Sequence, residues 1–228
     1  MKKFITVAGL LAVCLVIAAK SHAYTPTSGT KIGGSKHDFT VAYSGVGGVT
    51  APAINQCSTC HEMHKPAKMM PLWGRQDPTA TGWKVQSHDV AYDLSETAET
   101  TTPDGAVLIS AGDLVKARSG MCLSCHDGVT TISNGVAMAA GVKANFGRDL
   151  SENHNIGRNR GTTSGGVAVA PEILATHDQA TVGGAVKYYI GCGSCHAMHD
   201  SKTNLKLVRN ASTPGVTGPV CLNCHSSK

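Results

Sequence analysis

The hydrophobic positions of the chain are concentrated at its start. A continuous apolar run covers residues 4–19, after Met1-Lys2-Lys3 and before the small residues Ser21-His22-Ala23. A basic start, a short apolar stretch and small residues at a cleavage point are typical of a secretory signal peptide. The pattern therefore predicts a signal peptide over residues 1–23 and a mature chain that begins at Tyr24.

Two other interpretations fit this first segment less well. A membrane-spanning helix needs about 20 consecutive apolar residues, and this run is shorter and ends in a cleavage-like site. Leu11-Ala12-Val13-Cys14 loosely resembles a lipoprotein cleavage box, but Val13 fits that box poorly and apolar residues continue beyond Cys14. Export through a cleaved signal peptide is the interpretation that fits best.

Beyond residue 23, few segments show a helical or strand periodicity. The pattern predicts a short helix over residues 113–118, short helices at the cysteine motifs described below, and a few brief strands such as 187–190. Residues 24–51 are rich in Gly and Thr, which predicts an extended arm or loop. The stretch 161–166 consists of Gly and small polar residues and predicts a boundary between two units.

Composition changes this picture, because the side chains alone would build only a thin core. Aromatic residues make up 4% of the chain, which contains 26 glycines. Something other than side chains must supply the apolar bulk. The formal charge of +5 falls to +2 without the three lysines of residues 1–23, which does not indicate a nucleic-acid partner.

The cysteines indicate what supplies that bulk. Apart from Cys14, all eight cysteines fall in four Cys-x-x-Cys-His motifs. Two thiols at this spacing form thioethers to a porphyrin, and the following His binds the iron from one face. The motifs predict four covalent c-type haems, attached at Cys57, Cys60, Cys122, Cys125, Cys192, Cys195, Cys221 and Cys224, with His61, His126, His196 and His225 as proximal ligands.

Paired cysteines also have other uses. They can bind structural zinc or act as redox dithiols, and eight cysteines outside the cytoplasm can form four disulfides. None of these uses needs a His directly after the second cysteine in all four motifs. Haem attachment explains the cysteines and the histidines together.

The motifs also indicate a duplication. The first continues as Cys-His-Glu62-Met63-His64 and the third as Cys-His-Ala197-Met198-His199, whereas the second and fourth share Cys-Leu-x-Cys-His. The chain therefore resembles a two-haem unit that occurs twice. We predict an N-terminal arm and first di-haem unit over residues 24–160 and a second di-haem unit over residues 161–228.

The sixth position of each iron separates electron carriers from enzymes, because an open site permits chemistry. His64 and His199 each follow a proximal His by three residues, so on a helical turn both imidazoles would project from nearly the same side. One helix cannot clamp both faces of one haem, so each would bind a neighbouring haem. The alternative for either is a surface histidine.

For the remaining two positions the pattern favours His37 and His154, which lie beside polar residues in expected loops. A carbonyl or carboxylate there could hold the second ring nitrogen. Pattern alone ranks them little above His88 and His177. The methionines could ligate instead, but we interpret them as haem-packing residues: Met63, Met69, Met70, Met121, Met138 and Met198.

These motifs resemble the paired (doubled) Cys-x-x-Cys-His multihaem cytochromes of metal-reducing bacteria. The resemblance implies that His37, His64, His154 and His199 are the distal ligands. The family often has Pro after the third of these histidines, where this chain has Asn155. The matching residues span most of the mature chain: Lys36-His37-Asp38, 57–64, Pro71-Leu72-Trp73-Gly74-Arg75, 122–128, Leu150-Ser151, His154-Asn155-Ile156-Gly157 and 192–224.

With its signal peptide, four motifs and this length, the chain is similar to the outer-surface tetrahaem cytochromes of the OmcE kind, whose subunits polymerise into extracellular filaments. The resemblance implies a multihaem cytochrome c fold, with mostly loops, short α-helices at the haem motifs, few short strands and a core of stacked haems. It also implies that one distal His comes from the next subunit, and His37 on its Gly-rich arm is the candidate.

The expected function is electron transfer by four low-spin, bis-histidine haems, with no substrate turned over. The expected location is the outer surface. Other multihaem cytochromes, further copies of the chain and a terminal acceptor such as a metal oxide are the expected partners. Two alternatives stay open: a soluble periplasmic electron shuttle, and a multihaem reductase with an open iron site.

Overall fold

The computed structural model describes residues 37, 58–68, 72–132, 137–164, 167–168 and 171–198. All structural statements below concern these residues. The predictions for the signal peptide, the arm, Cys57, His199 and the fourth motif lie outside them, so they stay predictions.

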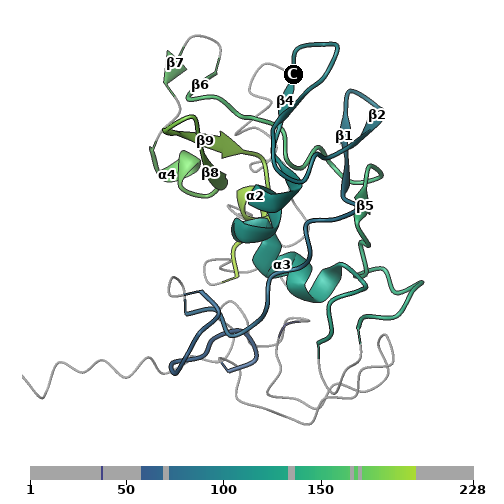
Figure 1. Ribbon diagram of the computed structural model, residues 1–228. Coiled ribbons are helices and arrows are strands. Elements are labelled where there is room, and N and C mark those ends of the chain that lie inside the picture. The colour runs from purple at the N-terminus through teal and green to yellow at the C-terminus, as the bar shows by residue number, and fades with distance from the viewer. Residues whose placement is uncertain are drawn as a thin grey trace, which may run out of the picture.

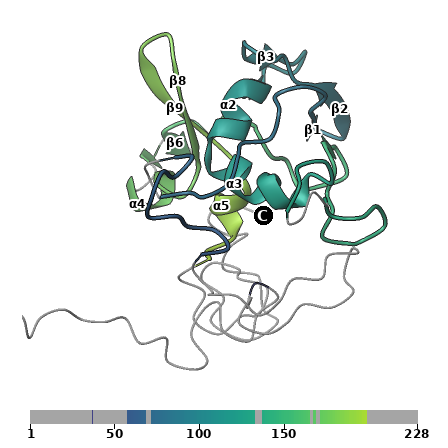
Figure 2. The same ribbon diagram turned by 60° about the horizontal axis from the view of Figure 1, so that its bottom comes forward.

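Two helices occupy the centre of the described region, α2 (Ala111–Lys116) and α3 (Arg118–His126). Figures 1 and 2 show small β-structures on opposite sides of these helices. On one side lies the antiparallel hairpin of β8 (Asp178–Val182) and β9 (Ala185–Tyr189). On the other side lies a sheet with the strand order β2-β1-β5.

In that sheet, β1 pairs antiparallel with β2 and parallel with β5. The further elements are short and complete the framework around the two helices. The bounds of all these elements are β1 Lys84–Ser87, β2 Val90–Asp93, β3 Thr100–Thr101, β4 Val107–Leu108, β5 Asp149–Leu150, β6 Thr163–Ser164, β7 Val167–Ala168, α4 Pro171–Leu174 and α5 Cys192–Cys195.

Helix α2 begins where Ser110 caps it. The Ser110 Oγ accepts a hydrogen bond from the Asp113 N–H at 3.1 Å and donates one to the Asp113 carboxylate at 2.6 Å. Such a cap satisfies an N–H group that has no partner inside the helix. Asp113 in the first turn and Lys116 in the last turn also complement the helix dipole.

Ala117 separates α2 from α3, because its extended backbone ends the first helix and starts the second. The chain turns back on itself there, and Gly120 of α3 lies directly against the Val115 carbonyl oxygen of α2. A side chain at position 120 would collide with that oxygen. The sharp turn that aims α3 therefore depends on glycine at this position.

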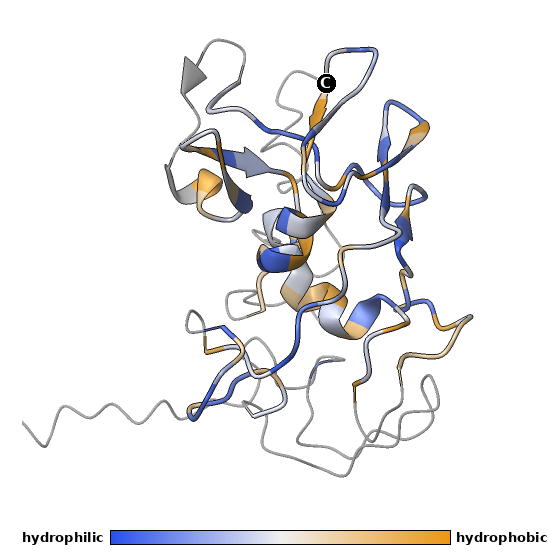
Figure 3. Ribbon diagram, viewed as in Figure 1, coloured by the Kyte–Doolittle hydropathy of each residue, from blue (hydrophilic) through white to orange (hydrophobic). Residues whose placement is uncertain are grey.

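One hydrophobic cluster holds these elements together. It includes Leu108, Leu114 and Leu123 from the first predicted unit together with Ala180 and Tyr189 from the second. Figure 3 shows hydrophobic segments at β4 and in α2 and α3, where this cluster lies. The predicted boundary at 161–166 falls at the β6–β7 hairpin, but the core extends across it.

The short helix and strand that the sequence predicts each overlap an element of the structure. The helix expected over 113–118 overlaps α2, and the structure divides it at Ala117 because the chain turns there. The strand expected over 187–190 lies largely within β9. In the described part of the chain, no helix has both the length and the apolar character needed to cross a membrane.

Candidate haem-binding site

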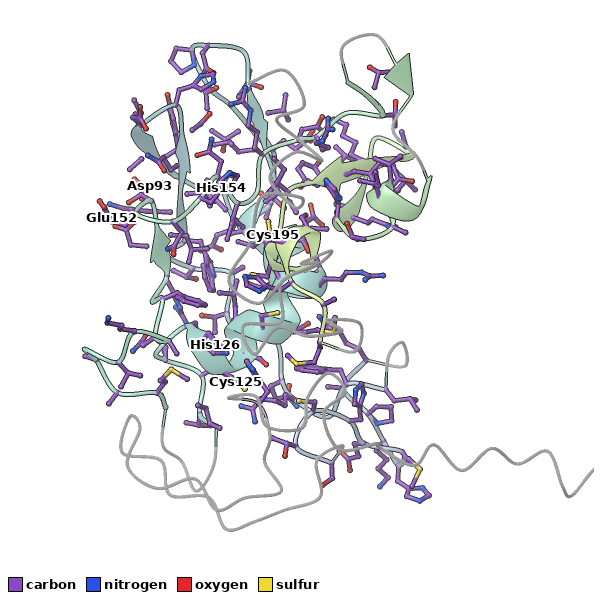
Figure 4. The ribbon with its side chains drawn as sticks, turned by 180° about the vertical axis from the view of Figure 1, so that it is seen from behind. Asp93, Cys125, His126, Glu152, His154 and Cys195 are labelled. Carbon is purple, nitrogen blue, oxygen red and sulfur yellow. The ribbon has the colours of Figure 1, made fainter. Side chains whose placement is uncertain are left out.

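The second motif lies on the best-formed helix of the described region. Helix α3 carries Cys122, Cys125 and His126, and the spacing of three and four residues places them on neighbouring positions of one helical surface. Figure 4 shows Cys125 and His126 together at the end of α3, and Cys195 on α5. One face of α3 can therefore present two thiols and an imidazole to the same ligand.

The imidazole of His126 is fixed by the loop that follows the motif. Its Nδ1 lies 2.7 Å from the Ala144 carbonyl oxygen, and this contact places the ring proton on Nδ1. The ring stacks on Phe146 with centroids 5.2 Å apart, and the Phe146 N–H donates to the His126 carbonyl at 2.9 Å. Metal-binding histidines are held in this way, with the other ring nitrogen directed to the metal.

His37 lies on the same side of the molecule as His126. Their ring centroids are 5.8 Å apart, and the planes are inclined by 55°. Two imidazoles that each bind one metal ion at about 2 Å from opposite sides have centroids about 6 Å apart. The distance between the rings therefore allows His37 and His126 to hold one iron together, and both would be ligands of a haem attached at Cys122 and Cys125.

Both histidines of this pair favour the neutral form, which is the form that binds metal. Burial lowers the pKa of His126, although the hydrogen bond to Ala144 opposes this shift. Burial, together with the nearby His126 and His196, lowers the pKa of His37 to about 4. At neutral pH both rings can therefore offer an unprotonated nitrogen to iron.

The first motif has a different local structure. Residues 58–60 form a turn, and His61 pairs with Trp73 in an antiparallel bridge. The Gly74 N–H donates to the Cys60 carbonyl at 2.9 Å, and the two rings of His61 and Trp73 meet edge to face at 6.0 Å. The backbone around Trp73 thus holds the first motif in a turn that ends in a bridge at His61.

The prediction of a short helix at the first motif is therefore wrong. Backbone pairing with Trp73 competes with the helix, and Lys65 adopts a positive φ of 58° directly before Pro66. A proline disfavours the helical conformation for the residue before it, so a helix could not continue through Lys65. His64 is exposed in this turn. His61 and His64 therefore do not share one face of a helix.

Arg75 connects the first motif to the second. Its guanidinium donates to the carbonyl oxygens of Ser124, Thr131 and Ile132 at 3.1, 2.6 and 3.1 Å. Arg75 lies two residues after Trp73, which pairs with the first motif, and Ser124 lies inside the second motif. One side chain therefore holds together two Cys-x-x-Cys-His motifs that are far apart in sequence.

We expect Arg75→Met to lower the free energy of unfolding by roughly 3 kcal/mol. A hydrogen bond from a charged donor contributes about 1.5–3 kcal/mol, and the three bonds of Arg75 together fall near the upper end of that range because one is exposed and two are only partly buried. Unfolding in guanidinium chloride, followed by circular dichroism, measures this loss. Arg158→Met is the matched control, since Arg158 bonds the exposed His88 and should cost less than about 1 kcal/mol. Equal losses in the two variants would contradict this role of Arg75.

The third motif forms α5, and its helix ends at Cys195. His196 follows with an extended backbone, so it leaves the helix in a different direction from its cysteines. His196 is close enough to His37 to influence its pKa. The second and third motifs therefore lie near a common histidine.

The other spare histidines have distinct surroundings. His88 is engaged at both ring nitrogens, with Asp104 at 2.6 Å and Arg158 at 3.0 Å, which disfavours it as an iron ligand. His154 is exposed and lies well away from His126 in Figure 4. His177 is buried, and its Nδ1 lies 2.9 Å from the Ile173 carbonyl oxygen.

Asp178 is a fully buried carboxylate between the second and third motifs. Its Oδ1 accepts the Ser119 N–H at 2.9 Å, while its Oδ2 has no hydrogen-bond partner. Burial raises the pKa of Asp178 to about 6, although Ser119 and the charges of Arg118 and Lys68 oppose this shift. The carboxyl group therefore titrates close to neutral pH.

This shift predicts a dependence of stability on pH. Because the pKa is higher in the folded state, Asp178 favours folding most below its ordinary pKa, and that contribution is lost as the pH rises through about 6. We expect the wild type to lose on the order of 3 kcal/mol relative to Asp178→Asn between pH 4 and pH 7. Unfolding curves in guanidinium chloride at both pH values test this. The same difference in the free energy of unfolding between the wild type and Asp178→Asn at pH 4 and pH 7 would contradict it.

Several residues that hold the motifs in place belong to no recognisable sequence motif. Ala144 acts through its carbonyl oxygen, so its side chain gives no signal. Phe146 and Ser119 are single residues in segments without a recognisable sequence pattern. Arg75 belongs to the segment that matches the multihaem family, and Asp178 directly follows a histidine. Only these last two offered a signal in the sequence.

Comparison with known proteins adds no assignment. No protein-family model matches the chain, and no curated protein matches it. Among the described residues, no group of three or more His, Cys, Asp or Glu side chains is arranged to hold a metal ion. The functional argument therefore depends on the motifs and on the geometry around them.

Proposed function

We propose that the chain is an exported tetrahaem c-type cytochrome that transfers electrons and turns over no substrate. Its four Cys-x-x-Cys-His motifs use every cysteine outside residues 1–23. When bound, each haem supplies an iron that alternates between the ferric and ferrous states and so carries one electron. The polypeptide holds the irons, sets their spacing and limits the access of water.

The observation that carries this proposal is the imidazole pair at the second motif. His126 is held at Nδ1 by a backbone carbonyl, and His37 lies 5.8 Å from it. This distance allows the two neutral imidazoles to bind one iron together. If both bound it, no coordination site would be left for a substrate, which supports an electron carrier over a reductase.

The same residues support a low reduction potential. Bis-histidine ligation lacks the methionine that raises the potential in other cytochromes c. The hydrogen bond from His126 to the Ala144 carbonyl also makes the imidazole a more basic ligand, which gives more electron density to the iron. A more basic ligand stabilises the ferric state and so lowers the reduction potential.

We also propose that the protein works at the outer surface and polymerises there into filaments that deliver electrons to a terminal acceptor such as a metal oxide. This part rests on the signal-peptide pattern and on the resemblance to filament-forming tetrahaem cytochromes. The contact between His37 and His126 favours His37 as a ligand within its own chain. A ligand supplied by the next subunit would then be another histidine.

Electron cryomicroscopy of shed surface material tests both parts of the proposal. A polymer with two imidazoles at every iron is the expected result. Single particles would favour the soluble periplasmic shuttle. An open axial position, together with a high-spin absorption band or tight binding of cyanide, would contradict an electron carrier and favour a reductase.

A further inference from the structure

The second and third motifs meet at a buried polar junction formed by Ser119 and Asp178. The Cys192 N–H donates to the Ser119 Oγ at 2.8 Å, and the Ser119 N–H donates to the Asp178 Oδ1 at 2.9 Å. Both side chains are fully buried. Ser119 lies in α3 and Cys192 begins α5, so one serine bonds the two helices that carry the motifs.

Asp178 also completes the start of α3. The cap residue Ala117 offers no side-chain hydrogen bond, and the first N–H groups of a helix have no partners within it. Asp178, which is 59 positions away from Ser119 in the sequence, supplies one of these bonds. A carboxylate at this end is also favoured by the helix dipole.

Gly191 makes this close junction possible. A side chain at position 191 would collide with the Asp178 carboxylate and with the Ser119 hydroxyl. Cys192 follows directly, so the third motif begins immediately against the polar pair. Neither motif can shift at the junction without breaking a buried hydrogen bond, which costs about 1–3 kcal/mol.

The junction brings the first cysteines of the two motifs into contact. The thiols of Cys122 and Cys192 share a hydrogen bond, and this bond and burial raise the pKa of Cys122 above its usual range. Each of these sulfur atoms would carry one haem. The attachment points of the second and third haems are therefore neighbours, although the predicted unit boundary lies between them.

We propose that Ser119 and Asp178 are positioning residues for electron transfer between the haems attached at the second and third motifs. This inference rests on the proposed function. One electron leaves a ferrous iron and enters a ferric iron, and no bond forms or breaks. Because electron transfer weakens steeply with distance, the bonds that fix α3 against α5 determine how fast this step is.

The charge of Asp178 gives the junction a second effect. A buried carboxylate stabilises the more positive, ferric state of a nearby iron, because charges interact strongly where water is excluded. Arg118 and Lys68 are the cations that face it, and the sulfur atoms of Cys122 and Cys192, which would carry the two haems as thioethers, are close to it. Asp178 therefore lowers the potentials of the two haems that it joins.

Three variants of the haem-loaded protein test the junction. Asp178→Asn keeps an oxygen for the Ser119 N–H but removes the charge, and we expect the midpoint potentials of two haems to rise while two stay unchanged. Ser119→Ala removes the acceptor for Cys192, and we expect weaker magnetic coupling between two haems in electron paramagnetic resonance. Ser110→Ala is the matched control, since Ser110 is also a buried serine that accepts a backbone N–H, but as the cap of α2.

The outcomes separate this inference from the proposed function. Four unchanged potentials in Asp178→Asn, or the same coupling in Ser119→Ala as in Ser110→Ala, would overturn the role of the junction while the haems remain. A protein without a haem absorption band would instead overturn the proposed function. A general loss of structure would appear in the control as well, and a change confined to Ser119→Ala supports the positioning role.

Discussion

Replacing Cys122 and Cys125 together by serine should remove one of the four proposed haems and interrupt electron transfer between the first and third motifs. Arg75 bonds the segment after the first motif to α3, and Ser119 bonds α3 to the third motif, so a haem attached at the second motif would lie between those of the first and third. Loss of this haem should therefore break the path between the first and third haems. The haem content, measured as the pyridine haemochrome, should fall by one haem per chain.

The control for this prediction is Cys14→Ser, because Cys14 belongs to no motif and lies in the predicted signal peptide. That variant should keep all four haems. In the double variant, the reduction of the remaining haems should become biphasic in stopped-flow absorption, since electrons no longer pass along one path. Full haem content after the double replacement would contradict attachment at these cysteines.

Replacing His37 by alanine should convert one of the four haems from low spin to high spin. His37 lies 5.8 Å from His126, and its removal leaves one axial position without an imidazole. Water or a weak ligand then occupies that position and gives a high-spin iron. Electron paramagnetic resonance of the oxidised protein counts the affected haems directly.

His88→Ala is the matched control for this prediction. Both ring nitrogens of His88 are engaged by Asp104 and Arg158, so its loss should leave every haem low-spin. If His37→Ala also leaves all haems low-spin, His37 is not a ligand in this chain. If a high-spin haem appears in His88→Ala instead, then His88 is the ligand and His37 is not.

The sequence predicts a chemistry for the site but not how its motifs are arranged in space. Covalent attachment needs two thiols and a histidine at fixed short spacing, so the second and third motifs are visible without a structure. The spatial relation between them is not visible in this way. It depends on Asp178, which acts across 59 positions, and on the carbonyl oxygen of Ala144, which any residue could provide.

The first motif shows why local pattern was insufficient for the fold. The spacing of His61 and His64 is helical, but the backbone of Trp73 pairs with His61 and excludes a helix. The start of α2 was missed for a similar reason, because the cap comes from Ser110, three positions before the expected start at residue 113. Long-range pairing and capping override periodicity in elements this short.

The intact mass of the mature, purified protein under denaturing and reducing conditions tests the central claim most directly. Thioether bonds survive this treatment, whereas disulfides and bound zinc do not. The account predicts the mass of residues 24–228 plus four haems, in a protein that is red. A colourless protein with the mass of the polypeptide alone would contradict it.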